Sequence, residues 1–289
     1  MPRVLVVGCG YVGEAASDFF HGQGWDVEGW TASAESAGRL VEKPYPVRAV
    51  NITAADLFAG AGDGFDVVIQ STSTRGGAVE DYRRLYLRGA QRLLHLYPAA
   101  KLIFTSSTSV YGQKKGEIVD EGSLADPDHE KGRVLREAEG IVLTRGGIVI
   151  RAGGIYGPGR SYLVRSVLEG KSIIDSGRDR FLNQVHRDDM VAAYFLLAEK
   201  RADFGGEIFN VVDDEPILAS EAIQWLAERL RQSAPLSDGS TMRKRGATNK
   251  RVSNRKLRGR GWELRFPCFR EGMTRSVLPS LGRSDQPGT

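Results

Sequence analysis

The sequence predicts an α/β protein built on a doubly wound parallel sheet, followed by a smaller C-terminal lobe. Through the first half of the chain, short runs rich in Val and Ile alternate with amphipathic stretches. These runs lack the polar alternation of half-exposed strands, so both of their faces should be buried. The intervals between them mostly supply the dozen residues that a parallel crossover needs. We therefore expect one sheet with helices on both faces.

The individual elements follow from the same pattern. Strands are expected at 3–7, 26–30, 46–50, 66–70, 101–106 and 147–151, with helices near 11–23, 34–42, 79–97 and 129–143. Beyond residue 155 the pattern loosens, and it predicts helices at 161–169, 188–200, 219–231 and 269–280 and strands at 172–175 and 207–212. We predict a sheet domain at 1–155. A mixed segment at 156–283 should partly return to the sheet and form the smaller lobe, and a disordered tail is expected at 284–289.

Composition narrows the class of protein. The chain has 289 residues, 41% hydrophobic and 26% charged, which is ordinary for a soluble globular protein. It has no run of about 18 apolar residues, and the N-terminal apolar run "VLVV" is too short for a signal peptide, so we predict a cytoplasmic protein without a membrane segment. Cys9 and Cys268 give neither a disulfide framework nor zinc spacing, so no metal is expected.

Positive charge gathers near the C-terminus. Residues 240–289 hold 13 Lys and Arg but only three Asp and Glu. A solvated surface, a pocket for an anionic ligand and a nucleic-acid site would each explain this excess. The segment lacks the interleaved aromatic residues of single-strand binders, so we do not expect nucleic acid as a partner.

A glycine-rich turn follows the first strand. Gly8, Gly10 and Gly13 form G-x-G-x-x-G between a strand and a helix. In this pattern the first glycine permits the tight turn, the second lets the backbone approach a pyrophosphate, and the third lets helix and strand pack closely. The pattern predicts a Rossmann-type lobe that binds a dinucleotide through this turn, including the amides of Tyr11 and Val12.

The end of the second strand bears on the choice of coenzyme. An acidic residue there binds the ribose hydroxyl of NAD, but this chain has Trp30, Thr31, Ala32 and Ser33. We therefore predict NAD(P), with a slight preference for NADP, and Thr31 and Ser33 as contacts. Arg39 comes late for a dedicated phosphate clamp.

Five further blocks, taken with the glycine turn, resemble one family. They are "IFTSSTSVYG" (103–112), "VIRAGGIYGPGR" (149–160), "NQVHRDDMVAAYFLLAE" (183–199), "GEIFNVVDDEPI" (206–217) and "KRVSNRKLRGRGWELRFPCFREGM" (250–273). In order and spacing the chain resembles the extended short-chain dehydrogenases/reductases, in their NAD-dependent epimerase/dehydratase branch.

The resemblance implies roles for particular residues. It places Ser107 at the position of the catalytic hydroxyl, which would hydrogen-bond the substrate oxygen; alternatively, the Ser/Thr run there only satisfies backbone groups. His186 matches the junction of the lobes, where a structural hydrogen bond is the simpler explanation. Implied coenzyme contacts are Asn51, Ile52, Ser71, Thr72, Ser73, Ser106, Gly154 and Ile155, and implied substrate contacts are Thr108, Tyr156, Arg160, His186 and Arg251.

One expected pair of residues is missing. In the family, a Tyr about 20 residues beyond "VYG" acts as the acid/base, and a Lys four residues later lowers its pKa. Aligning Ala138 and Glu139 with the family places Lys131 at the Tyr position and Leu135 at the Lys position. Either the chain is an enzyme that uses other groups, with Ser107, Tyr111, Lys131 and Arg133 as candidates, or it binds NAD(P) without hydride chemistry. For Lys131, an exposed residue at a helix start is the simpler explanation.

Two functions therefore remain open. The first is an atypical NAD(P)-dependent oxidoreductase or epimerase/dehydratase that acts on a carbonyl or hydroxyl carbon of a small molecule. The second is a non-catalytic NAD(P)-binding sensor. Basic residues in segments that border the cleft in relatives suggest an anionic or nucleotide-linked substrate; they are Arg151, Arg160, Arg165, Lys250 and Arg251. Relatives often form homodimers through the helices near 79–97 and 129–143. The apolar stripe of Leu85, Leu93, Leu94 and Leu96 could face a partner or the sheet.

Overall fold

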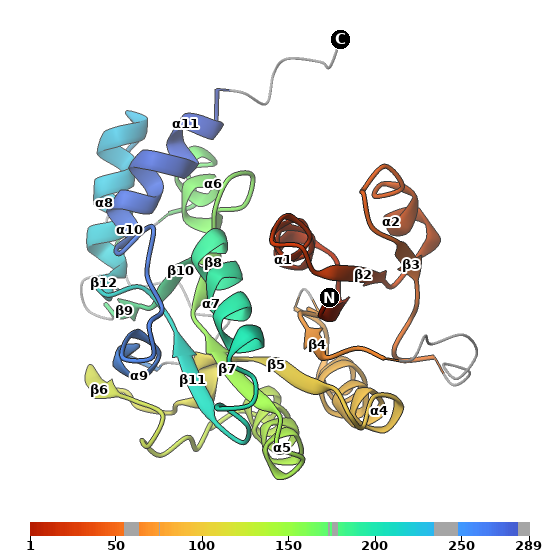
Figure 1. Cartoon of the computed structure of the whole chain (residues 1–289). Helices are drawn as coiled ribbons and strands as arrows, with labels where there is room; N and C mark the ends of the chain where they lie inside the picture. Colours follow the sequence, from red (N-terminus) through yellow and green to blue (C-terminus); the bar gives the residue numbers. More distant parts are fainter. Residues whose placement is uncertain (55–63, 75, 173, 175–178, 234–247, 283–289) are drawn as a thin grey trace.

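A seven-stranded parallel sheet forms the centre of the molecule (Figure 1). The structure, a computed structural model, describes residues 1–54, 64–74, 76–172, 174, 179–233 and 248–282. The strand order is β11-β7-β5-β4-β1-β2-β3, and all neighbours pair in parallel. The strands are β1 (Arg3–Val7), β2 (Asp26–Thr31), β3 (Val47–Ala49), β4 (Val67–Gln70), β5 (Lys101–Ser107), β7 (Ile148–Ala152) and β11 (Ile208–Val211). This confirms the predicted doubly wound fold.

Helices cover both faces of the sheet, as Figure 1 shows. On one face α1 (Tyr11–Gly22) packs against α7 (Arg187–Glu199), and their buried side chains join those of the sheet in one hydrophobic cluster. The other face carries α5 (Glu130–Thr144) and a long helix formed by α3 (Val79–Tyr82), a π-helical segment at 83–88 and α4 (Gly89–Leu96). Strands β4 and β7 are buried along their whole length, because both of their faces meet helices.

The leucine stripe of the long helix packs on the sheet. Leu93 is fully buried in the second hydrophobic cluster, and Leu85, Leu94 and Leu96 are partly buried against it. The structure therefore accounts for the stripe through packing within one chain. A homodimer through this region stays a prediction.

The C-terminal part has a third hydrophobic cluster, which includes side chains of α6 (Tyr162–Leu168), α8 (Ala219–Leu230) and α10 (Phe269–Gly272). In Figure 1 these helices gather with α11 (Leu278–Ser280) at one end of the molecule, whereas β11 returns to the edge of the main sheet. Three small two-stranded ladders and α9 (Arg255–Arg258) connect the two parts. The ladders are β8 (Gly154–Tyr156) with β10 (Gln184–His186), β9 (Phe181–Leu182) with β12 (Ile217–Leu218), and β6 (Glu117–Val119) with β13 (Lys250–Val252).

Some predicted elements differ from the structure. The helix expected at 34–42 is only α2 (Ala34–Gly38), which buries no side chain and so lacks the packing that lengthens helices. Most of the loop expected at 233–250, part of the strand expected at 172–175 and all of the tail expected at 284–289 lie outside the described residues. Within the described part of the chain, no helix combines the length and the apolar character that crossing a bilayer requires.

Candidate active site

The carboxyl ends of the parallel strands bring the predicted site residues to one edge of the sheet. Gly8 follows β1, Ser71 follows β4, Ser107 ends β5 and Gly153 follows β7. In open parallel sheets this edge is where ligands bind, at the point where the strand order reverses. Here that point lies at β1, whose neighbours are β4 on one side and β2 on the other.

The glycine turn has the geometry of a pyrophosphate cradle. Gly8 has a φ of +94°, and a Cβ there would lie 2.9 Å from the backbone of Ser71 and Thr72. A Cβ on Gly13 would lie 2.2 Å from the carbonyl oxygen of Gly8. Around Gly10, by contrast, no described atom lies within 4 Å of such a Cβ. No side chain caps α1, so its N-terminal amides remain available to an anion.

The residues predicted at the adenosine end lie beyond β2 and β3. Thr31 is buried and its hydroxyl donates to the carbonyl oxygen of Ser33 (3.1 Å). Ser33 caps α2 by accepting the Ser36 amide (3.3 Å). Arg39 lies one turn later; its Nη2 donates to Ser36 Oγ (3.1 Å), and its Nη1 lies 3.7 Å from the Glu35 carboxylate.

The segment after β3 forms a turn that the Asn51 side chain stabilises. Asn51 is exposed, and its Oδ1 accepts the amide (3.0 Å) and the hydroxyl (2.8 Å) of Thr53. Ile52 is buried in the hydrophobic cluster on the sheet face that carries α4 and α5. Of these two predicted contacts, only Asn51 is accessible to a ligand.

The loop after β4 approaches the glycine turn closely. The Ser71 amide donates to the Val7 carbonyl oxygen (2.8 Å), and the Ser71 hydroxyl accepts from Tyr194 of α7 (3.3 Å). The hydroxyl of Thr72 is buried without a hydrogen-bond partner among the described residues, whereas Ser73 is exposed. An orphaned hydroxyl beside the cradle suits a site that a polar ligand completes.

Ser107 is the last residue of β5. Its Oγ accepts the Ser109 amide (3.1 Å) and so caps a 3₁₀ turn at Thr108–Val110. The side chain is half-buried, and its hydroxyl proton has no acceptor among the described residues. Thr108, the neighbouring candidate, is buried inside the turn. Ser107 therefore combines the backbone-capping role with a donor that a substrate oxygen could use.

Tyr111 and Ser106 belong to a buried network instead. The Glu139 carboxylate accepts from Ser106 Oγ (2.6 Å) and from Arg151 Nη2 (2.8 Å). Arg151 also donates to Tyr111 OH (2.9 Å), which in turn donates to Asn210 Oδ1 (2.9 Å). Tyr111 is fully buried, and burial raises the pKa of its phenol above the ordinary value. The structure thus commits both predicted site residues, and Arg151, to internal contacts.

Helix α5 shows what fills the positions of the missing pair. Leu135, at the family's Lys position, is buried in the hydrophobic cluster under the sheet. The Lys131 ammonium, at the family's Tyr position, lies 5.4 Å from the centre of the Tyr82 ring in α3. Lys131 therefore contacts a neighbouring helix, and no described contact joins it to Ser107.

The loop after β7 lies against the start of α1. The Tyr11 hydroxyl donates to the Pro158 carbonyl oxygen (3.1 Å), and the guanidinium of exposed Arg160 lies 5.1 Å from the centre of the Tyr11 ring. Burial raises the pKa of Tyr11 to about 12. Gly154 is exposed and Ile155 is half-buried in β8. Thus the predicted coenzyme and substrate loops meet at Tyr11.

His186 and Tyr156 face the interior of the C-terminal lobe. His186 Nδ1 accepts the Asp188 amide (3.1 Å) and caps α7, which leaves Nε2 to donate to Ser276 Oγ (2.9 Å). Burial lowers the pKa of His186 to about 4, so it stays neutral. Tyr156 is buried against His186, and its hydroxyl has no partner among the described residues. The geometry favours the structural explanation of His186.

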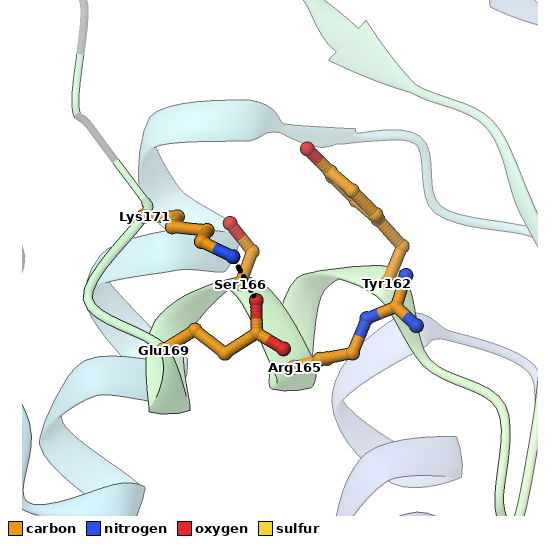
Figure 2. Close-up of a pocket in the computed structure, with 5 residues that line it drawn as sticks. All are labelled: Tyr162, Arg165, Ser166, Glu169 and Lys171. Carbon is orange, nitrogen blue, oxygen red and sulfur yellow. Dashed lines mark hydrogen bonds and ion pairs between the residues drawn. The ribbon is translucent and has the colours of Figure 1, made fainter.

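A pocket of about 350 Å³ lies along α6 (Figure 2). Figure 2 shows the exposed Tyr162 ring and the Arg165 side chain on the same helix, with Lys171 paired to Glu169 at the other end (2.7 Å). Ser166 completes the lining. Arg165 was expected to border the substrate cleft, and here it lines this pocket.

Lys250 was expected to border the substrate cleft, and the structure buries its side chain. It belongs to β13, is only 5% exposed, and its Nζ donates to the Tyr111 carbonyl oxygen (2.9 Å). Arg251, the predicted substrate contact, instead donates through Nε to the Gly116 carbonyl oxygen (2.9 Å) and covers the Phe181 ring. A basic run normally indicates a solvated surface, so the sequence held no clear signal for the burial of Lys250.

Comparisons with known proteins agree with this architecture. A family model described as the NAD dependent epimerase/dehydratase family matches residues 4–211. Protein YeeZ of Escherichia coli K12 is 31% identical over 224 residues, which are 73% of this chain and 77% of YeeZ.

Two solved structures illustrate the shared fold. The Thermus thermophilus UDP-glucose 4-epimerase complex with NAD has a TM-score of 0.81 at 21% identity, over 98% of this chain and 100% of that one. MoeE5 in complex with UDP-glucuronic acid and NAD has a TM-score of 0.78 at 21% identity, over 98% and 99%. The family match, the YeeZ similarity and the sheet together establish that the chain belongs to the NAD-dependent epimerase/dehydratase family of extended short-chain dehydrogenases/reductases.

Proposed function

We propose that the protein is an NAD(P)-dependent enzyme that acts on a carbonyl or hydroxyl carbon of a small molecule. The observation that carries the proposal is the open turn at Gly10. The N-terminal amides of α1 have no capping side chain, and no atom of the described residues beyond its chain neighbours and its own helix backbone lies within 4 Å of a Cβ built on Gly10. Amides in this arrangement bind the pyrophosphate of a dinucleotide. Membership of a family described as NAD dependent supports the same ligand.

We favour NADP over NAD as the coenzyme. The end of β2 carries no carboxylate to bind a ribose hydroxyl pair. Instead α2 begins there with Ser33 and Ser36 and brings the Arg39 guanidinium to Ser36. Two hydroxyls and a guanidinium suit a 2′-phosphate. Isothermal titration with NADPH and NADH would test this, and tighter binding of NADH would contradict it.

Ser107 is the residue we assign to the substrate oxygen. A bound nicotinamide would supply or accept the hydride at the reacting carbon. The Ser107 hydroxyl, held in place by the Ser109 amide, would donate a hydrogen bond to the oxygen on that carbon. Tyr111 does not fit this role, because its hydroxyl is buried between Arg151 and Asn210.

For the substrate we propose an anionic or nucleotide-linked small molecule. Two structural relatives support this class: one is named a UDP-glucose 4-epimerase, and the other is a complex with UDP-glucuronic acid. The excess of basic residues near the C-terminus agrees with it. We retain a cytoplasmic location as part of the proposal.

A non-catalytic sensor is the second candidate, and helix α5 favours it. Buried Leu135 cannot bind a ribose hydroxyl or lower the pKa of a neighbouring acid, and Lys131 contacts the Tyr82 ring. The helix therefore lacks the pair that performs proton transfer in the family. Turnover separates the two candidates. The enzyme should oxidise NADPH with some member of a carbonyl panel, and Ser107→Ala should abolish that turnover while coenzyme binding persists.

The coenzyme site itself can be tested with two glycine variants. A Cβ on Gly10 meets no described protein atom, so Gly10→Ala should fold normally yet occupy the space of the pyrophosphate. Gly140→Ala in α5 is the matched control, since its Cβ also meets nothing. We expect calorimetry to show NADPH affinity at least about tenfold weaker, or about 1.4 kcal/mol, for Gly10→Ala only. Equal affinity in both variants, or no coenzyme binding by the wild type, would refute the proposal.

A further inference from the structure

Tyr194 lies in α7 and carries a hydroxyl into apolar surroundings. Its side chain is fully buried, and its ring belongs to the hydrophobic cluster that joins α7, α1 and the sheet. The phenol oxygen has two hydroxyl partners, Thr105 Oγ1 of β5 (2.6 Å) and Ser71 Oγ of the loop after β4 (3.3 Å). A buried hydroxyl without partners costs free energy, and these two contacts offset that cost.

The hydrogen bonds of Tyr194 have a fixed direction. Its phenol donates to Ser71 Oγ, and a phenol has only one proton. Burial raises the pKa of Tyr194 above the ordinary value, so that proton stays on the phenol. In the other contact Thr105 must therefore be the donor. Ser71 keeps a proton that has no acceptor in the part of the chain that the structure describes, whereas Thr105 has used its proton and can only accept.

Ser71 and Thr105 lie at the edge of the sheet where ligands bind. Both side chains are half-buried, in contrast to Tyr194. The backbone of Ser71 touches the glycine turn, since a Cβ on Gly8 would lie 2.9 Å from it. Thr105 comes two residues before Ser107 and shares its face of β5, because side chains alternate along a strand. The two hydroxyls therefore lie between the glycine turn and Ser107.

The strand order relates this hydroxyl pair to one half of a dinucleotide. A dinucleotide lies across the point where the strand order reverses, with one nucleotide on each side. The adenosine end is expected beyond β2 and β3, so the nicotinamide nucleoside would lie over β4 and β5. That nucleoside carries ribose hydroxyls and a carboxamide, which offer both donors and acceptors.

Helix α7 is held in place independently of any ligand. Near its N-terminus the Asp189 carboxylate accepts the amides of Arg265 (2.7 Å) and Phe266 (3.1 Å). Trp262 Nε1 also donates to the Asp189 carbonyl oxygen (3.1 Å). Tyr194 follows in the same helix. The fold therefore positions its phenol oxygen before a coenzyme binds.

We propose that Tyr194 is a positioning residue for the coenzyme, which orients the Ser71 hydroxyl as a donor and the Thr105 hydroxyl as an acceptor toward the nicotinamide nucleoside. This rests on the function proposed above and adds Tyr194 and Thr105 to the expected coenzyme site. Tyr194 is too deeply buried to touch the ligand, so it acts through its two hydroxyl partners.

Calorimetric titration tests the assignment. The wild type, Tyr194→Phe, Ser71→Ala and the double variant would be titrated with the coenzyme that the wild type binds more tightly, NADPH or NADH. Each would also be titrated with the matching adenosine fragment, 2′,5′-ADP or ADP, which lacks the nicotinamide nucleoside. Tyr111→Phe is the matched control, because its buried hydroxyl also has two hydrogen-bond partners, Arg151 and Asn210.

Loss of one neutral hydrogen bond weakens binding about fivefold, and we expect that factor for Ser71→Ala. Tyr194→Phe should weaken coenzyme binding about threefold, because the released Ser71 hydroxyl can still rotate toward the ligand. The double variant should lose about fivefold rather than the product of the two single losses, since Tyr194 acts through Ser71. Affinity for the adenosine fragment should not change in any variant, and Tyr111→Phe should bind the coenzyme like the wild type.

The assignment is overturned if Tyr194→Phe or Ser71→Ala binds the coenzyme as tightly as the wild type, or if the fragment loses as much affinity as the coenzyme. Losses that multiply in the double variant, or an equal loss in Tyr111→Phe, would also overturn it. A Tyr194→Phe chain that does not fold would count against it, because the phenol would then serve the structure. A folded wild type that binds neither coenzyme would instead refute the proposed function.

Discussion

Replacing Arg151 by Met should destabilise the fold without altering the ligand site. Arg151 is 1% exposed and donates to Glu139 and to Tyr111 OH. Burial alone would lower its pKa, but the hydrogen bonds and charge of Glu139 raise it above the ordinary value, so Arg151 stays positively charged. Its removal leaves a buried carboxylate that only Ser106 and Arg136 stabilise.

Breaking a buried pair in this way costs about 3–5 kcal/mol. With an unfolding entropy of about 2.1 cal/mol/K per residue, a chain of this length loses about 5–8 °C in Tm. The double variant Arg151→Met/Glu139→Gln also removes the buried carboxylate, which in Arg151→Met keeps Arg136 as a cationic partner, and it should recover about 1–3 kcal/mol of that loss.

Differential scanning calorimetry on the two single variants and the double variant would measure the coupling, with NADPH affinity determined in parallel. Arg133→Met, at an exposed position of α5, is the control and should change stability by less than about 0.5 kcal/mol. The reasoning fails if Arg151→Met melts within about 1 °C of the wild type, or if it folds normally but no longer binds NADPH. The second result would place Arg151 at the ligand site.

Three further predictions concern single residues. Lys250→Met should be more stable than the wild type by about 3 kcal/mol below pH 8, because the pKa of Lys250 falls from 10.5 to about 8 on folding. This difference in stability should shrink as pH rises from 8 to 10.5, where only the unfolded chain still binds the proton. Urea melts that give the same difference at every pH would contradict the prediction. Asp213 is buried, and neither of its carboxylate oxygens has a hydrogen-bond partner within 3.5 Å among the described residues. Burial and Asp214 raise its pKa well above the ordinary value, so Asp213→Asn should stabilise the protein at pH 7 and lose that advantage at pH 3; a destabilised variant at pH 7 would show a required charge. Gly13→Ala should lower both stability and NADPH affinity because its Cβ would overlap the Gly8 carbonyl oxygen, and a variant with normal Tm would show that the turn relaxes easily.

Much of the sheet could be predicted because each of its longer strands is a short apolar run that can be recognised in the sequence alone. Runs such as "VLVV" and "DVVIQ" are buried on both faces, and the spacing of Gly8, Gly10 and Gly13 encodes the turn that follows β1. The sequence did not predict the short strands β6, β8, β9, β10, β12 and β13, because a segment of two or three residues is too short to show a hydrophobic periodicity. Their pairing arises from contacts between distant segments.

The candidate site was predictable only in outline. The Ser107 position follows from where β5 ends, and backbone geometry alone sets it. Tyr111 and Arg151 looked like site residues because polar groups near a strand end usually face a ligand. Their partners, Glu139 and Asn210, come from α5 and β11, and only the tertiary fold brings them together. The resemblance placed Lys250 in a segment that borders the cleft, but nothing in its basic run indicated that the side chain would be buried.

The pairing of β13 with β6 has a consequence for how the protein is made. Strand β13 begins at residue 250, whereas β6 and the turn after Ser107 are complete by residue 119. During synthesis the ribosome must add about 130 residues before the ammonium of Lys250 can reach Tyr111. A nascent chain can therefore assemble the glycine turn and the first strands early, while the contact of Lys250 with the Tyr111 carbonyl oxygen forms only near the end of translation.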